Sequence, residues 1–299
     1  MEIPSLQSLV QMIDLRQTKK YGNFLQEIGW EVVHLKIANR PLQIFIKKLP
    51  FLPFSFIKIQ RPQTINFKKI KKIFFKHKTL IVKIEPDLFL NDGKNQIKDQ
   101  KKFFENSGFK QDKHGLLPSK TTWINLKKDE EYLLKQIKKD ARYCLKQALK
   151  NSIQIIKSKN LETFHQLLRQ NCRLGRLFAY PLSHLKILKK TLKKDFLLFL
   201  AHDNFKKPLS GAIILFSPEV AYYYLAATSK EGRKLLAQYL ILWEAIKEAK
   251  KAGKEIFDLE GIYDVRFPQK SWLGFSHFKK SFGGQEIEYP GCFTKLFFF

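Results

Sequence analysis

The chain is poor in cysteine and lacks the ligand spacings that build metal or disulfide frameworks. Its three cysteines, an odd number, are widely separated along 299 residues and include no Cys-x-x-Cys pair: Cys144, Cys172 and Cys292. The sequence therefore predicts neither a disulfide framework nor a structural zinc site, and we expect the thiols to be packing residues. The seven histidines show no His-Glu-x-x-His or comparable spacing, so no metal is expected.

Long apolar runs are also missing. No stretch approaches the roughly 18 uninterrupted apolar residues that a membrane-spanning helix needs, and the start MEIPSLQSLV lacks the basic and apolar regions of a signal peptide. A hydrophobic content of 44% can nevertheless bury a sizeable core, and the length predicts two domains of ordinary size. We expect a globular cytoplasmic protein.

Acidic residues are scarce. The chain has 27 Asp and Glu against 55 Lys and Arg, a net charge of +28. Such a charge attracts polyanions and favours binding to nucleic acid or to an anionic membrane surface. The excess is mostly lysine in a chain that is also rich in Ile, Phe and Asn, which an AT-rich genome produces without selection for a binding face. Both explanations stay open, so the charge supports a nucleic-acid partner without establishing one.

The glycine-rich loops that cradle phosphates are absent as well. There is no GxSxG, P-loop or GxGxxG motif. Acetyl-CoA-dependent acetyltransferases use a Gln/Arg-x-x-Gly-x-Gly/Ala loop, in which glycine lets the pyrophosphate approach backbone N–H groups. The corresponding segment here is SKEGRKLLAQ, and counting from Arg233 the glycine position is Leu236. Coenzyme A is therefore the less favoured acyl donor, and we predict no cofactor.

Hydrophobic periodicity divides the chain into two blocks of mixed strand and helix. In the first block we expect helices at 19–28, 65–75 and 96–106, and strands at 31–37, 42–48, 54–60, 80–85 and 121–126. In the second block we expect helices at 161–171, 181–193 and 235–252, and strands at 153–157, 196–202, 209–216, 221–227 and 255–259. The pattern indicates an α+β fold with antiparallel meanders.

The segment FDLEGIYDVRFPQKSWLGFSHFKKSFGG, residues 257–284, combines a buried strand, a loop and a basic aromatic helix. Its aromatic residues recur at helical spacing, so one face can pack while the adjoining turn presents ammonium groups. Paired glycines then end the helix as C-cap residues do. In this segment the chain resembles the Fem-type (FemABX) peptidoglycan bridge aminoacyltransferases, which carry Phe-Lys followed by Phe-Gly-Gly, here Phe278-Lys279 and Phe282-Gly283-Gly284.

The resemblance extends over nearly the whole chain. It includes QTKKYGNFLQEIGW at 17–30, Gly-Phe at 108–109 before TTWINL at 121–126, ARYCLKQA at 141–148, and the stretch from 222 to 261. It implies two tandem acetyltransferase-like (GNAT-like) domains, residues 1–120 with 290–299 and residues 121–289, because the C-terminal segment of that family returns to the first domain. The chain has no room for the long helical hairpin of some relatives, so it resembles the shorter, armless members.

The implied activity moves an amino acid from aminoacyl-tRNA to the peptide stem of a peptidoglycan precursor, in cell-wall bridge formation. The family's Phe-Lys lysine stabilises the tetrahedral intermediate, a role that falls on Lys279 with the Phe278 backbone beside it. The alternative is that Lys279 is one more lysine on a basic helix. Two other functions stay open, an acyl-CoA N-acyltransferase and a non-enzymatic nucleic-acid-binding relative.

One helix is expected to join the two blocks over 129–150, capped by Asp129. Four basic residues recur on one of its faces at every fourth position: Lys138, Arg142, Lys146 and Lys150. Like charges at this spacing destabilise a free helix, and a polyanion would relieve the repulsion. The face is either a contact to the tRNA backbone or an ordinary solvated surface.

Precursor-binding residues are implied by the same resemblance. The family's Arg-x-x-x-Tyr matches Arg176 and Tyr180, although Arg173 fits the preceding arginine step equally well. Glu85, at a strand end, is placed to hold the attacking ammonium, and a helix-capping or surface role is the alternative. Tyr223 belongs to a tyrosine run that alternates faces along a strand, so we expect it or a neighbour to line the cleft.

The first domain departs from the family. Relatives carry a phosphate-binding lysine after Gln-x-x-x-Trp, and the match Gln17-x-x-x-Tyr21 puts Leu25 at that position, with Lys19 or Lys20 as substitutes. This departure leaves open whether the precursor is bound and whether it is nucleotide- or lipid-linked. We expect a monomer, either cytoplasmic or in peripheral contact with the inner membrane face.

Overall fold

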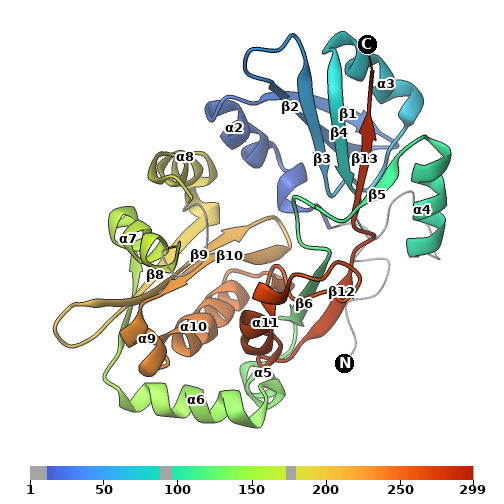
Figure 1. The fold of residues 1–299 in the computed structure, drawn as a ribbon. Coiled ribbons are helices and arrows are strands. Elements are labelled where there is room, and N and C mark those ends of the chain that lie inside the picture. Colours follow the sequence, from blue (N-terminus) through green and yellow to red (C-terminus); the bar gives the residue numbers. More distant parts are fainter. Residues whose placement is uncertain (1–11, 88–95, 173–179, 299) are drawn as a thin grey trace. The chain divides into compact units, whose positions relative to one another are not determined.

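The computed structural model describes residues 12–87, 96–172 and 180–298 (Figure 1). These residues divide into two compact units. The N-terminal unit comprises the described parts of Ser5–Thr121, Tyr263–Lys270 and Ile287–Phe299, and the C-terminal unit comprises those of Thr122–Ile262 and Ser271–Glu286. Each unit has its own sheet and its own hydrophobic core, which confirms the predicted α+β class.

A six-stranded sheet forms the N-terminal unit, in the order β1-β2-β3-β4-β13-β5. Its strands are β1 (Glu31–Ile37), β2 (Arg40–Lys48), β3 (Ser55–Gln60), β4 (Thr79–Glu85), β5 (Lys110–Asp112) and β13 (Cys292–Leu296). Its helices are α2 (Lys19–Glu27), α3 (Phe67–Lys76) and α4 (Gln96–Asn106), preceded by a 3-10 turn at Leu15–Gln17. Strand β13 pairs with β4 and β5, so the C-terminal segment returns to the first sheet as predicted.

The two faces of this sheet differ in chemistry because side chains alternate along each strand. Ile57 and Ile59 of β3 face a fully buried core that includes residues of α3 and α4. Between them Lys58 lies on the opposite face, where its neighbour Phe45 packs edge-on against Tyr21 of α2 at 6.3 Å between ring centres. This second face therefore combines aromatic and charged residues.

A seven-stranded sheet, in the order β12-β6-β11-β10-β9-β8-β7, forms the C-terminal unit. Its strands are β6 (Lys120–Asn125), β7 (Gln154–Ser158), β8 (Phe196–His202), β9 (Pro208–Phe216), β10 (Val220–Thr228), β11 (Ile256–Asp258) and β12 (Gln285–Glu288). Its helices are α5 (Glu130–Gln136), α6 (Lys139–Lys150), α7 (Leu161–Cys172), α8 (Leu182–Leu192), α9 (Lys230–Lys234), α10 (Ala237–Lys251) and α11 (Leu273–Lys280). Eight consecutive residues of β9, Leu209 to Phe216, are buried, as expected for a strand covered on both faces.

The central strands separate at one point of this sheet. Strand β10 pairs with the parallel strand β11 from Val220 to Tyr222, opposite Asp258, whereas β10 itself continues to Thr228. A bulge interrupts the pairing of β10 with β9 between Tyr223 and Leu225. The backbone after Asp258 is thus no longer paired with β10, and it supplies the carbonyl groups of the candidate site.

Most predicted elements match the structure to within two residues, but the single helix expected over 129–150 is wrong. Asp129 caps α5 as predicted, its carboxylate accepting from Tyr132 N at 2.7 Å. The helix then breaks, because Ile137 is extended and buried and Lys138 N donates to Ser281 O at 2.8 Å. Tertiary packing outweighs helix propensity at this junction.

The helix predicted from 235 also begins differently. Leu236 lies in the left-handed region with φ 59°, between the short helix α9 and the start of α10 at Ala237. Within the described residues, no helix is long and apolar enough to cross a membrane.

Candidate active site

Helix α11 presents the Phe-Lys pair of the sequence motif. On its packed side the Phe278 ring meets Tyr239 at 4.9 Å and Phe282 at 5.5 Å, between ring centres. Phe282 is 2% exposed, so the aromatic face joins the core of the C-terminal unit as the spacing predicts. Lys279 follows Phe278 and therefore projects from the next position around the helix.

The two glycines after this helix permit close backbone packing. Gly283 and Gly284 have φ values of +83° and +90°, which an L side chain adopts only with strain. A Cβ on Gly283 would lie 2.8 Å from Gln136 O, and one on Gly284 would lie 2.5 Å from Trp123 O. The motif therefore anchors α11 against the end of α5 and against β6.

The ammonium of Lys279 is held by main-chain carbonyls. Its Nζ donates to Glu260 O at 3.0 Å and to Gly261 O at 2.9 Å. The same Nζ lies 5.0 Å from the centre of the Phe275 ring and 6.0 Å from that of Tyr223, within the range of a cation–π contact. A positive charge is thus fixed beyond the end of β11, beside the point where β10 and β11 part.

Asp258 organises the loop that holds this lysine, a role that sequence reasoning missed. It is 4% exposed, and its carboxylate accepts from Trp123 Nε1 at 3.0 Å and from Glu260 N at 2.7 Å. Glu260 itself has φ 54°, a conformation that costs energy for a residue with a side chain. The sequence did contain a signal for this role, because Asp258 is an acidic residue in an otherwise apolar, buried strand.

Tyr223 faces a buried polar network rather than open solvent. It is 4% exposed, and its hydroxyl accepts a hydrogen bond from the side-chain amide of Gln238. The Gln238 carbonyl oxygen in turn accepts from Thr228 Oγ1 at 2.7 Å and from the Ser210 hydroxyl. Burial raises the pKa of Tyr223 above its ordinary range, so the hydroxyl stays protonated. The prediction that Tyr223 lines a cleft stays a prediction.

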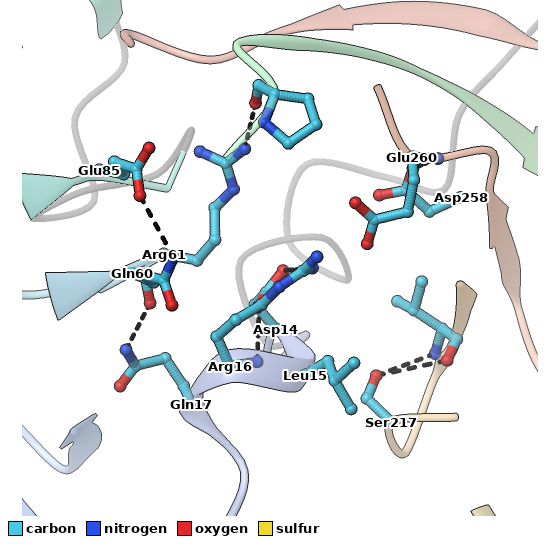
Figure 2. Close-up of polar contacts among 12 residues, drawn as sticks. Asp14, Leu15, Arg16, Gln17, Gln60, Arg61, Glu85, Ser217, Asp258 and Glu260 are labelled. Carbon is cyan, nitrogen blue, oxygen red and sulfur yellow. Dashed lines mark hydrogen bonds and ion pairs between the residues drawn. The ribbon is translucent and has the colours of Figure 1, made fainter. Parts of the chain in front are cut away.

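In the N-terminal unit, Glu85 and Arg61 are buried charged residues whose main chains are joined by a hydrogen bond from Arg61 N to Glu85 O at 2.7 Å (Figure 2). Glu85 Oε1 accepts from the backbone N–H groups of Leu116 and Leu117, both at 2.6 Å, and burial raises its pKa. The Arg61 guanidinium donates to Pro118 O at 2.5 Å and lies 3.4 Å from the centre of the Tyr289 ring. Both side chains thus order the segment around residue 117. A substrate role for Glu85 stays a prediction.

The N-terminal unit holds a half-buried lysine, Lys58, that sequence reasoning missed. Leu25 is 3% exposed and belongs to the core, so that position cannot present a charge. An exact Gln-x-x-x-Trp occurs instead at Gln26–Trp30, and Lys58 Nζ lies 4.4 Å from the centre of the Trp30 ring. Burial lowers the pKa of Lys58 to about 8, while the nearby Glu85 carboxylate opposes this shift. Lys58 was not found because it comes from another strand, β3.

The remaining residues predicted to bind the precursor fall into three groups. Arg173 and Arg176 lie outside the described residues. Tyr180 packs edge-on against Tyr224 at 6.5 Å between ring centres. Lys20 is exposed in the first turn of α2.

The predicted basic stripe begins directly after the helix break and follows α6. Lys138 is the N-cap of α6, and the Arg142 guanidinium donates to Lys135 O at 2.6 Å across the junction. Lys146 and Lys150 are exposed along α6. Arg142 therefore has a structural partner, whereas Lys138, Lys146 and Lys150 face solvent.

The segment aligned with the acetyl-CoA loop keeps an unusual backbone. Leu236 adopts the left-handed conformation that glycine favours, and its side chain packs against the core of the C-terminal unit. The sequence predicted that the Leu236 side chain would crowd a bound phosphate. Because this side chain packs against the core, it blocks a phosphate less than that prediction implied. Among the described residues, no cluster of three or more His, Cys, Asp or Glu side chains is arranged to hold a metal ion.

Known proteins resemble this chain in sequence and in fold. Residues 183–297 match the model of the FemAB family. Over 94 residues the chain is 29% identical to aminoacyltransferase FemA of Staphylococcus aureus (strain MW2), a match that spans 31% of this chain and 22% of FemA. The crystal structure of FemX has a TM-score of 0.79 at 20% identity, covering 99% of this chain and 97% of that one.

A tandem GNAT protein from the clavulanic acid biosynthesis pathway is similar in fold alone. It has a TM-score of 0.54 at 8% identity, covering 87% of this chain and 81% of that one. The predicted fold of two tandem acetyltransferase-like domains is confirmed. The FemAB match includes the Phe-Lys and Phe-Gly-Gly pairs, so residues 183–297 carry the sequence pattern of the FemAB family, within a chain whose fold resembles that of FemX.

Proposed function

We propose that this protein transfers an amino acid from aminoacyl-tRNA to an amine on the peptide stem of a peptidoglycan precursor, as a cytoplasmic monomer. The observation that carries the proposal is the placement of Lys279, whose ammonium is fixed by the carbonyls of Glu260 and Gly261. The family resemblance supplies the class of reaction, and the site supplies a residue able to perform it.

The proposed chemistry requires no covalent enzyme intermediate. The acceptor amine attacks the ester carbonyl carbon of the aminoacyl-tRNA, and the carbonyl oxygen becomes an oxyanion in the tetrahedral intermediate. When that intermediate collapses, an amide bond has formed, the ester bond has broken, the amine has lost a proton and the ribose oxygen has gained one. The Lys279 ammonium stabilises the oxyanion, and because it is held in place it reorganises little as the charge develops.

Positioning residues support this lysine. The bond from Glu260 N to the Asp258 carboxylate fixes the loop that carries both carbonyls. The packing of Phe278 and the two glycines fixes the helix on the other side. Alignment of the reactants is itself a large part of catalysis for a bimolecular transfer, so a rigid support around Lys279 serves the proposed reaction.

Each unit, taken by itself, offers candidate cations for the precursor's diphosphate. Arginine suits phosphate because of its fork of donors, so we propose Arg173 and Arg176 for this role, with Tyr180 as a further precursor-binding residue. In the N-terminal unit, Lys58 supplies the charge that Leu25 lacks, since it is a lysine beside the Trp30 of the Gln-x-x-x-Trp motif. Lys20 is the second candidate there.

The proposed tRNA contact is the exposed part of α6. Lys146 and Lys150 lie one helical turn apart on a solvent-facing surface, which suits neighbouring phosphates of an RNA backbone. Arg142 and Lys138 adjoin them at the α5–α6 junction.

The proposal is tested by incubating the purified protein with charged tRNA and either a nucleotide-linked or a lipid-linked stem peptide. The expected result is a mass gain of one amino acid on the stem, dependent on the charged tRNA. A gain with acyl-CoA in place of tRNA would instead identify an acyl-CoA N-acyltransferase. RNA binding without transfer to either acceptor would favour the non-enzymatic alternative.

A further inference from the structure

One stretch of the N-terminal unit contains no acidic residue. Between Glu31 and Glu85 lie 53 residues with 13 Lys and Arg and neither Asp nor Glu. At the chain's average of 27 acidic residues in 299, about five would be expected there. A general excess of lysine does not produce such a gap, so this stretch is basic for a local reason.

The structure gathers much of this charge at one end of the first sheet. Seven of the lysines are exposed, at the end of β2, along α3 and just before β4: Lys48, Lys68, Lys69, Lys71, Lys72, Lys76 and Lys78. The starts of β3 and β4 are tied together, because Ser55 N donates to Lys78 O at 3.1 Å. Glu31, at the start of β1, contacts His77 at 3.6 Å.

Large apolar side chains are exposed in the midst of these lysines. On the loop between β2 and β3, Phe51 is 105% exposed and Leu52 is 53% exposed, between Pro50 and Pro53. The loop is closed at its base by the bond from Leu49 N to Phe54 O at 2.9 Å. Its tip is thus an apolar protrusion on a short, constrained loop.

The end of α3 and the C-terminal segment add to this protrusion. Phe75 is 52% exposed and lies 6.2 Å from Phe297, between ring centres, and Phe298 beside it is 88% exposed. Phe297 N donates to Leu80 O at 2.9 Å, and Lys78 N donates to Phe75 O at 3.0 Å. In Figure 1 the chain's C-terminus lies beside α3 at this end of the unit. Phe51, Leu52, Phe75 and Phe298 together form what we term the Phe51 surface.

We propose that the Phe51 surface docks onto an anionic lipid bilayer. The apolar side chains enter the headgroup and upper acyl region, while the surrounding lysines lie over the lipid phosphates. Interfacial anchoring of this kind combines buried apolar area with attraction to anionic headgroups, and neither alone gives stable attachment. The inference goes beyond the proposed transfer and does not depend on its chemistry.

The apolar residues favour a bilayer over nucleic acid as the partner. Aromatic rings can stack on bases, but Leu52 and the two flanking prolines have no such use, whereas a hydrocarbon boundary accepts all of them. Exposed apolar side chains in water are costly when gathered in one patch. A partner with both hydrocarbon and negative charge matches both properties of the surface.

The test measures sedimentation of the full chain with vesicles of phosphatidylcholine alone or mixed with phosphatidylglycerol. Parent protein is expected to bind the mixed vesicles in a salt-dependent way and the neutral vesicles weakly. The double variant Phe51→Ser with Leu52→Ser should lose about tenfold or more in affinity for the mixed vesicles. The parent gains free energy by moving these two apolar side chains from water into the bilayer, and the variant does not. Lys71→Gln with Lys72→Gln should weaken binding to the mixed vesicles alone.

A matched control lies in the other unit. Phe205 is 92% exposed on the loop between β8 and β9, followed by two exposed lysines, so Phe205→Ser removes a similar side chain from a similar setting. It should bind vesicles like the parent. The proposal is overturned if the parent does not bind the mixed vesicles or if the Phe51 and Leu52 double variant binds them as well as the parent. It also fails if that variant loses affinity only for tRNA, measured without vesicles, which would identify an RNA surface.

Discussion

Lys279 Nζ donates a hydrogen bond to Gly261 O at 2.9 Å, and this bond ties α11 to the loop that follows β11. The two residues are 18 positions apart in sequence. They come together because the Phe-Gly-Gly turn packs the helix onto β6 on one side, while Asp258 shapes the loop on the other. The ammonium is consequently set by main-chain geometry, which suits a group that must meet an oxyanion at a fixed place.

Replacing Lys279 with alanine should reduce turnover by about a hundredfold to a thousandfold, the usual effect of losing one oxyanion-stabilising donor. Binding of tRNA and precursor should change little. Single-turnover transfer from charged tRNA measures the effect, and Lys280→Ala is the matched control because that neighbour pairs with Glu286 instead. Parent-like turnover in the Lys279→Ala variant would show that the lysine is a bystander.

Asp258→Asn should destabilise the loop after β11. The carboxylate accepts from both Trp123 Nε1 and Glu260 N, and an amide has only one oxygen to replace two acceptors. One buried donor then faces an NH₂ group, at a cost of about 1–3 kcal/mol in the free energy of unfolding. Turnover should fall with little change in KM, since the loop positions Lys279. Trp123→Phe removes the other partner, and if it lowers turnover as much as Asp258→Asn, the bond to Glu260 is not the cause.

Two glycines in or next to α11 should respond in opposite ways to alanine. At Gly284 a Cβ would lie 2.5 Å from Trp123 O, at a φ of +90°, so Gly284→Ala should lower the free energy of unfolding by about 2 kcal/mol or more. At Gly274, inside the helix, a Cβ meets nothing within 4 Å, so Gly274→Ala should raise it by up to about 1 kcal/mol. Chemical denaturation of both variants compares them directly. Equal effects would mean that packing against β6 does not explain the motif.

Local patterns in the sequence predicted most of the fold because each element carries its own signal. The alternating strands of both sheets and the aromatic face of α11 follow from spacing alone. The break at Ile137 does not, because it depends on a hydrogen bond from Lys138 N to Ser281 O, about 140 residues further along the chain. A continuous helical pattern cannot reveal a distant partner for its backbone.

The candidate site was predicted only where its residues share one motif. Lys279 was found through the Phe-Lys pair, whereas its carbonyl partners come from a loop and Asp258 from a strand. Lys58 was missed for the same reason, because its approach to Trp30 depends on how β3 lies beside the neighbouring strands. Leu25 could not be assigned as buried from the motif alone, since that depends on the packing of α2.

If α6 follows an RNA backbone, Lys146→Gln with Lys150→Gln should weaken tRNA binding and flatten its salt dependence. Each lost phosphate contact lowers the slope of log affinity against log salt by about 0.7–0.9, so the pair should lower it by about 1.5. Lys206→Gln with Lys207→Gln, on an exposed loop of the same unit, is the control for net charge. A slope unchanged by the α6 pair, or changed equally by both pairs, would leave α6 as an ordinary solvated face.

The lowered pKa of Lys58 predicts a pH-dependent contribution to stability. The folded protein holds this proton up to a pH of about 8, whereas the ordinary pKa of lysine is 10.5, so between these values the unfolded chain binds more protons and the free energy of unfolding rises with pH. Below pH 8 the folded state carries the full cost of a desolvated ammonium, at most about 3 kcal/mol. Lys58→Met keeps the apolar stem beside Trp30 and removes that cost.

The variant should therefore be more stable than the parent at pH 7, and its advantage should shrink as the pH rises from 8 to 10.5. Denaturation of both proteins across this range gives the difference directly, so that other titrating groups cancel. A constant difference would mean that Lys58 titrates normally. If the precursor's diphosphate contacts Lys58, as proposed, the bound anion should raise the pKa of this lysine. Precursor affinity should then decline above pH 8 in the parent but not in Lys58→Met, which should bind more weakly throughout.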